Sequence, residues 1–126
     1  MDGKTHLGAG LIAGVSIVYV RNKLGLDIGN DVLIVTGCCV GSLLPDIDIP
    51  DSMMGHLLLP LSIPINSLFG HRTITHSILF MAIVCLIGIL LKAPYSLNMG
   101  LLIGIVTHLM LDGSTPMGVR LLYPFH

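Results

Sequence analysis

Residues 78–91 read ILFMAIVCLIGILL, a run without a single charged, amide or hydroxyl side chain. A helix on the surface of a soluble protein carries a polar stripe along its solvent-facing side, with polar residues recurring every three or four positions. This run has no such stripe. It therefore favours a membrane-spanning helix over its main alternative, a helix of a soluble four-helix bundle.

Three further apolar runs cover residues 7–20, 32–44 and 97–111. A spanning helix needs roughly 20 predominantly apolar residues, and each run approaches that length only with its Gly, Ser and Thr flanks. We predict an all-α fold, a polytopic membrane helical bundle of about four short transmembrane helices. The spans fall at approximately residues 5–20, 29–44, 75–91 and 97–111 of a single integral-membrane domain, residues 1–126. No signal-peptide cleavage site follows the first run, so we expect it to be retained.

The overall composition agrees with a membrane protein. Hydrophobic residues make up 53% of the chain and charged residues only 10%, against about 25% charged in an ordinary soluble domain. The net charge of −1 provides no basic face for nucleic acid, so nucleic-acid binding is excluded. All seven acidic residues are Asp, and six His accompany them. Polar groups in hydrocarbon are costly unless they are paired or functional.

Glycines recur four residues apart in three of the predicted spans, at Gly10 and Gly14, at Gly37 and Gly41, and at 100 and 104. Such pairs let helix backbones approach closely in a membrane. We expect a compact bundle, with a homo-oligomer through the Gly-rich faces as a further possibility. Between the second and third spans, four prolines interrupt residues 45–75. They favour an interfacial or re-entrant segment over a fifth span.

Polar residues collect at one end of this predicted bundle. With four spans, the N-terminus, the loop between spans two and three, and the C-terminus all lie on one membrane face. The residues that the topology brings to this face are His6, Asp46, Asp48, His71, Arg72, His76, His108 and Asp112. The opposite face, residues 21–31 and 92–96, contains no His.

The spacing of these residues indicates shared faces. His108 and Asp112 are four apart and lie on one side of a helix. Asp46 and Asp48 follow Pro45, and in an extended segment two carboxylates two residues apart point the same way. Both pairs are suited to holding a cation.

Arg72 and His76 are also four apart, at the predicted head of span three. His71 is then expected to turn inward from the preceding loop. Arg72 can bind a phosphate oxygen in bidentate fashion. The neighbouring hydroxyls that we expect to face a substrate are those of Thr73, Thr75 and Ser77.

Imidazole and carboxylate are the ligands expected for zinc, manganese or iron. The predicted metal ligands are His6, Asp46, Asp48, His71, His76, His108 and Asp112. This set is enough for one or two divalent ions, with zinc favoured. The predicted catalytic residues are Asp48, Arg72, His76 and Asp112. A metal-activated water would be the nucleophile.

Three motifs give the chain a family resemblance. The segments GSLLPDID (41–48), HRTITHS (71–77) and THLMLDGSTPMGVRLLYPF (107–125), with Thr5-His6 near the start, resemble the YdjM-type membrane-bound metal-dependent hydrolases. The resemblance implies a multi-pass protein of the prokaryotic inner membrane and assigns the same His and Asp residues to a metal site. Many such relatives continue past the Tyr-Pro-Phe motif, so the chain is either a short member or a piece of a longer one.

The function expected is hydrolysis of a phosphoester in a membrane lipid or lipid-linked substrate. The alternative is a metal-binding membrane protein, a transporter, sensor or structural subunit, that uses the same cluster without hydrolysis. A transporter needs ionisable residues near mid-membrane, and the four spans show none there. The positive residues divide equally between the two faces, so the positive-inside rule leaves the sidedness open.

Overall fold

Helices form at all four apolar segments that the sequence indicates. The computed structural model describes residues 2–125, and this part of the chain contains helices and no strands, which confirms the all-α class. The four segments correspond to α1 (Gly3–Leu24), α2 (Asp31–Gly41), α5 (Ile78–Leu90) and α6 (Tyr95–Gly113). Between α2 and α5 lie two 3-10 helices, η1 (Leu44–Asp48) and η2 (Ile74–His76), and two short helices, α3 (Met53–Leu57) and α4 (Leu59–Phe69).

Capping residues set the helix ends. The Asp2 side chain accepts a hydrogen bond of 2.8 Å from the Thr5 N–H at the start of α1. Gly25, in the left-handed conformation with φ of 66°, caps the other end of this helix. Such caps satisfy backbone groups that a helix end leaves without partners. At the start of α5, the Ser77 hydroxyl accepts from the Phe80 N–H. This cap makes α5 begin three residues later than the predicted span.

The glycine pairs bring α2 close to both α1 and α6. A Cβ added at Gly14 would lie 3.0 Å from the Val35 Cα, and one at Gly37 would lie 2.7 Å from the Leu97 carbonyl oxygen and 2.9 Å from the Gly100 Cα. The predicted close approach of backbones is therefore confirmed. These glycine faces pack within the chain, and the homo-oligomer stays a prediction.

Replacing Gly37 tests this packing. Gly37→Leu should destabilise the bundle by roughly 1–3 kcal/mol or more, the usual cost of overpacking, because the added atoms meet backbone that has no room to yield. The free energy of unfolding in detergent measures the effect. Gly8→Leu is the matched control, since a Cβ at Gly8 has nothing within 4 Å. Equal stability of the two variants would contradict the packing.

Large apolar side chains cover the outside of the bundle. In α5 the one described buried residue is Gly88, while Ile89 is 62% and Leu90 70% exposed. By length and hydropathy α6 could cross a membrane; α4 and α5 are apolar but shorter. Among the described residues, buried polar side chains outnumber buried hydrophobic ones. This distribution is the reverse of that in a soluble domain.

The Pro-rich segment between α2 and α5 folds into short helices. Pro60 stands in the first turn of α4 and Pro64 lies inside it. The 11 residues of α4 extend about 16 Å at 1.5 Å per residue, about half of the hydrocarbon thickness. The segment is held to the bundle by an apolar cluster centred on Leu43, Ile47 and Met54.

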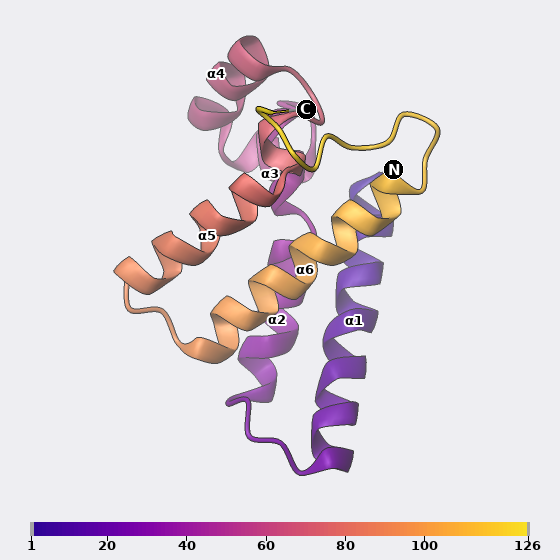
Figure 1. The fold of residues 1–126 in the computed structure, drawn as a ribbon, viewed down its shortest axis with the longest axis vertical. Helices are drawn as coiled ribbons and strands as arrows, with labels where there is room; N and C mark the ends of the chain where they lie inside the picture. Colours follow the sequence, from indigo (N-terminus) through magenta and orange to yellow (C-terminus); the bar gives the residue numbers. More distant parts are fainter. Residues whose placement is uncertain (1, 126) are drawn as a thin grey trace.

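Three parts of the chain lie at one end of the molecule. Figure 1 shows that the N-terminal end of α1, the α3–α4 segment and the C-terminal end of α6 lie at the same end of the bundle, whereas the α1–α2 and α5–α6 connections lie toward the other. All the elements that carry the predicted polar residues therefore meet at one end.

Candidate metal centre

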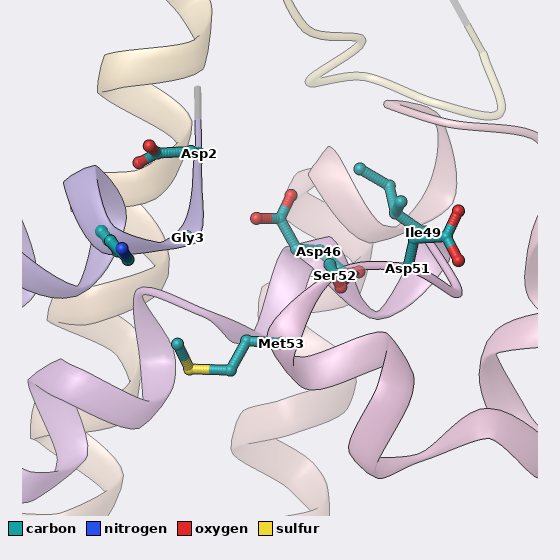
Figure 2. A pocket seen from close by; sticks show the side chains of 8 residues that line it. Asp2, Gly3, Asp46, Ile49, Asp51, Ser52 and Met53 are labelled. Carbon is teal, nitrogen blue, oxygen red and sulfur yellow. Dashed lines mark hydrogen bonds between the residues drawn. The ribbon is translucent and has the colours of Figure 1, made fainter.

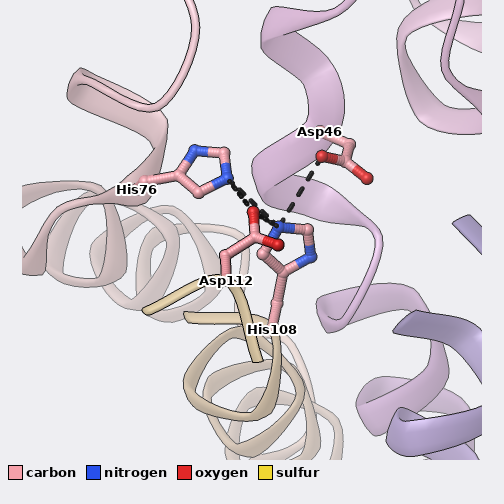
Figure 3. Close-up of side chains that lie close together, drawn as sticks. All are labelled: Asp46, His76, His108 and Asp112. Carbon is pink, nitrogen blue, oxygen red and sulfur yellow. Dashed lines mark hydrogen bonds and ion pairs between the residues drawn. The ribbon is translucent and has the colours of Figure 1, made fainter. Parts of the chain in front are cut away.

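Four side chains from three separate elements form a buried cluster. Asp46 of η1, His76 of η2, and His108 and Asp112 of α6 each offer a ligand atom within 4.8 Å of the others (Figure 3). All four residues are at most 5% exposed. Buried carboxylates are rare unless they are paired or bind a metal ion.

The distances within the cluster are short. On α6, His108 Nε2 lies 3.4 Å from Asp112 Oδ2 at the predicted spacing of four residues. His76 Nε2 lies 3.2 Å from the same carboxylate oxygen and 3.1 Å from His108 Nε2. Asp46 Oδ1 lies 3.6 Å from His108 Nε2. Figure 3 shows the two Nε2 atoms directed into the space between the two carboxylates.

Hydrogen bonds on the far sides of the rings fix their tautomers. His108 Nδ1 lies 2.6 Å from the Ser42 carbonyl oxygen, which can only accept, so Nδ1 carries the proton. The Thr75 hydroxyl donates to Asp48 at 2.7 Å and lies 3.0 Å from His76 Nδ1, so His76 also donates from Nδ1. In the neutral rings, both Nε2 atoms therefore present lone pairs to the cluster, as metal-binding histidines do.

Asp46 and Asp48 point to different partners, and the predicted parallel arrangement is wrong. Pro45 stands at the start of η1, where its fixed φ favours a helical turn. In a 3-10 helix side chains two residues apart diverge, because each residue turns the chain by about 120°. Asp46 approaches His108, whereas Asp48 approaches the 71–76 loop, with His71 Nδ1 at 3.0 Å.

Asp48 organises that loop. Its carboxylate accepts from the Arg72 N–H at 2.9 Å and from the Thr75 hydroxyl, and it lies 3.4 Å from His76 Nδ1. A second group of candidate ligands, Asp48, His71 and His76, is present, but its atoms are already joined by these hydrogen bonds. His71 turns inward from the loop, as predicted, with 33% of its side chain exposed.

Arg72 precedes the helix and does not share a helical face with His76, which corrects the prediction. Its φ of 58° is left-handed, a conformation in which helical spacing does not apply and which is concentrated at functional sites. The guanidinium donates to Thr115 Oγ1 at 2.8 Å and to the Gly118 carbonyl. Its Nη2 lies 3.3 Å from Asp112 Oδ1, so Arg72 lies directly against the cluster.

His6 lies beside the cluster and is not one of its four candidate ligands. Its ring stacks on His108 with centroids 3.6 Å apart, and its Nε2 lies 3.3 Å from Asp112 Oδ1. The side chain is fully buried, and neither ring nitrogen makes a hydrogen bond with the described residues. The structure thus brings all seven predicted ligands together, with four of them around one point.

Asp46 and Asp48 differ in their acidity. Burial raises the pKa of Asp46 to about 6. Burial also opposes ionisation of Asp48, but hydrogen bonds from His71, His76 and Thr75 outweigh it and hold the pKa of this carboxyl well below its usual range. Asp48 is therefore a permanent anion that holds the loop.

The hydroxyls of Thr73 and Ser77 make hydrogen bonds within the chain, and their predicted approach to a substrate stays a prediction. Thr73 donates to the Phe69 and Gly70 carbonyls and Ser77 to the Ile74 carbonyl. The sequence did not predict the role of Ser42, whose backbone carbonyl accepts a hydrogen bond from His108 Nδ1. A contact made by a backbone group cannot be identified from a pattern of residue types.

A pocket of about 420 Å³ reaches the cluster at Asp46. Its lining comes from the start of α1 and from the segment that follows η1, and Asp46, only 5% exposed, is the one residue common to the pocket and the cluster. Figure 2 shows the Asp46 carboxylate on the side of the pocket that faces Asp2 and Gly3. Water and small polar groups therefore have a route to this edge of the cluster.

Comparisons with known proteins give a family. The family described as YdjM inner membrane protein matches residues 1–126. The uncharacterized protein YvsG of Bacillus subtilis (strain 168) is 39% identical over 124 residues, covering 98% of this chain and 74% of that protein. The inner membrane protein YdjM of Escherichia coli (strain K12) is 40% identical over 98 residues, covering 72% of this chain and 49% of that protein. No solved structure matches the chain significantly.

Proposed function

Since the chain belongs to the YdjM inner membrane protein family, we propose that it is a multi-pass membrane enzyme that hydrolyses a phosphoester of a lipid or lipid-linked substrate at a divalent metal centre. Asp46, His76, His108 and Asp112 hold the ion. Zinc suits two imidazoles and two carboxylates in a compact buried set. Manganese and iron accept the same donors.

One observation carries the proposal, the facing Nε2 lone pairs of His76 and His108 at 3.1 Å. Two lone pairs at this distance repel unless a cation or a proton lies near both. Three buried carboxylates, of Asp46, Asp48 and Asp112, against one guanidinium, that of Arg72, leave a formal charge of −2. A single divalent cation balances that charge, and a buried charge without compensation is very costly.

The side chains around the centre have separate tasks. When bound, a divalent ion supplies a Lewis acid that lowers the pKa of water from about 15.7 toward roughly 7. The Arg72 guanidinium lies beside Asp112. Its positive charge is placed next to the centre, where it can bind a phosphoryl oxygen. Asp46 is the ligand at the edge of the open pocket, where water can approach the ion. Asp48 orients His76.

The membrane arrangement is part of the proposal. We take α1, α2, α5 and α6 as four short spans, with α3 and α4 at the interface. The exposed apolar side chains of α5 support lipid contact along its length. The cluster then lies at the membrane surface, at headgroup depth.

Metal removal tests the proposed function. Purified protein should contain about one divalent ion per chain by elemental analysis, and chelation should lower the temperature of unfolding in detergent, because bound metal contributes to folding stability. A screen of phospholipids and polyprenyl phosphates should reveal a product whose formation stops with the chelator and returns with the ion. Bound metal without turnover of any phosphoester would favour the non-hydrolytic alternative, and absence of metal would exclude both.

A further inference from the structure

Two hollows meet along residues 114–121, which follow α6. The first, of about 270 Å³, is lined by residues 71–73 and 117–120. The second, of about 350 Å³, lies between α5 and α6. Val119 lines both, and the Ile78 N–H donates to the Leu121 carbonyl at 2.9 Å, which holds this segment against the start of α5. The two hollows are therefore neighbours.

The first hollow carries two guanidinium groups. Arg72 and Arg120 line it together with His71, and no acidic residue does. Arg72 is held in place by Thr115 and Gly118, yet its buried Nε–H has no partner among the described residues. Arg120 is exposed and free to approach a ligand. Two guanidinium groups around a small hollow are suited to the oxygens of a phosphate.

The second hollow is apolar. Side chains of α5 and α6 line it together with Val119 and Leu121, and none of its lining residues is charged. It lies alongside two helices whose outer surfaces are apolar. An alkyl chain is the ligand whose chemistry fits it.

We propose that the two hollows together bind one anionic phospholipid, with its phosphate between Arg72 and Arg120 and one acyl chain in the groove between α5 and α6. This rests on the proposed function in one respect, because Arg72 connects the phosphate to the metal centre through Asp112. A zwitterionic lipid supplies the chain but no net charge, and a free phosphate supplies no chain. The continuity of a cationic and an apolar hollow favours a ligand that has both.

Native mass spectrometry of the full chain in detergent tests the proposal. The protein is treated with a chelator so that no turnover occurs, and phosphatidylglycerol or phosphatidylcholine with the same acyl chains is added. Both lipids carry the same phosphate, but the trimethylammonium of phosphatidylcholine brings a like charge next to Arg72 and Arg120. The wild-type protein should therefore retain phosphatidylglycerol about tenfold better. Equal retention of the two lipids would overturn the proposal.

Substitutions at two positions test the phosphate site and the acyl-chain groove separately. Arg120→Gln should abolish the preference for phosphatidylglycerol, and Arg120→Lys should keep most of it. Gly113→Leu should lower retention of the lipid, because Gly113 lines the groove and a Cβ there would lie 3.7 Å from Val119 Cγ2. Gly8→Leu, with open space around it, should not. Unchanged lipid binding in Arg120→Gln or Gly113→Leu would contradict the site.

Further measurements on the same samples distinguish other sources of binding. If inorganic phosphate raises the unfolding temperature of wild type and Gly113→Leu equally and no lipid is preferred, the hollow binds free anions and the lipid proposal fails. Metal content before chelation should be the same in Arg120→Gln as in wild type. Normal metal content without a lipid preference would refute this inference alone, whereas a lipid preference in a protein that never contains metal would refute the proposed function alone.

Discussion

Asp112→Ala is expected to weaken divalent-ion binding at the proposed centre strongly and to stop the hydrolysis proposed there. Three imidazoles lie within 3.4 Å of this carboxylate and the Arg72 guanidinium lies 3.3 Å away, so Asp112 is the centre of the cluster. A structural zinc site with four ligands is worth about 10–16 kcal/mol. Losing one ligand should therefore lower the affinity by about 100-fold or more. Titration of zinc into chelator-treated protein measures this loss.

Asp51→Ala is the matched control for Asp112→Ala. Asp51 is an exposed aspartate that lines the neighbouring pocket and lies outside both ligand groups, so its removal should leave metal content near that of wild type. Asp112→Ala also leaves Arg72 without its carboxylate partner, and circular dichroism should show that the helices remain. Full metal content and full activity in a folded Asp112→Ala variant would refute the proposed centre.

Asp48→Ala should have the second largest effect, and its main consequence should be on the loop. The carboxylate is fully buried and joins His71, the Arg72 backbone, Thr75 and His76. Removing one partner of a buried charged network typically costs 3–5 kcal/mol. Because His76 would lose the group that orients it, metal affinity should also fall by about 10–100-fold. Denaturation in detergent and zinc titration measure the two effects.

Asp48→Asn separates positioning from direct ligation. The amide keeps one oxygen that can accept from Thr75 or Arg72, so the loss of metal affinity should be smaller than in Asp48→Ala. An exposed control is Asp27→Ala, which removes only a local turn contact with Gly29 and should cost less than about 1 kcal/mol. If Asp48→Ala unfolds like Asp27→Ala and binds zinc normally, the carboxylate does not organise the centre.

The positions of the helices and the convergence of the polar residues were predictable from the sequence. Hydropathy locates the apolar helices. Because successive helices run in opposite directions, their number determines which connections lie at the same end of the bundle. His108 and Asp112 are the favourable case, because both lie inside a regular helix where a spacing of four residues has one geometric meaning.

The irregular segments were not predictable in the same way. Residues 44–48 and 74–76 are 3-10 helices, and their rotation per residue follows from tertiary contacts as much as from composition. The two-residue spacing of Asp46 and Asp48 therefore predicted that both carboxylates bind one cation. In the structure Asp46 approaches His108 and Asp48 approaches His71. The left-handed φ of Arg72 likewise depends on a hydrogen bond from its own N–H to Asp48.

The origin of the four donors in distant parts of the chain has a consequence for biogenesis. Asp46 emerges from the ribosome early, whereas His108 and Asp112 belong to α6, the final helix of the described chain. In the proposed arrangement, a nascent protein that has inserted only α1 and α2 has at most one of the four donors, too few to hold a metal ion. Metal loading at the proposed centre would therefore follow insertion of α6.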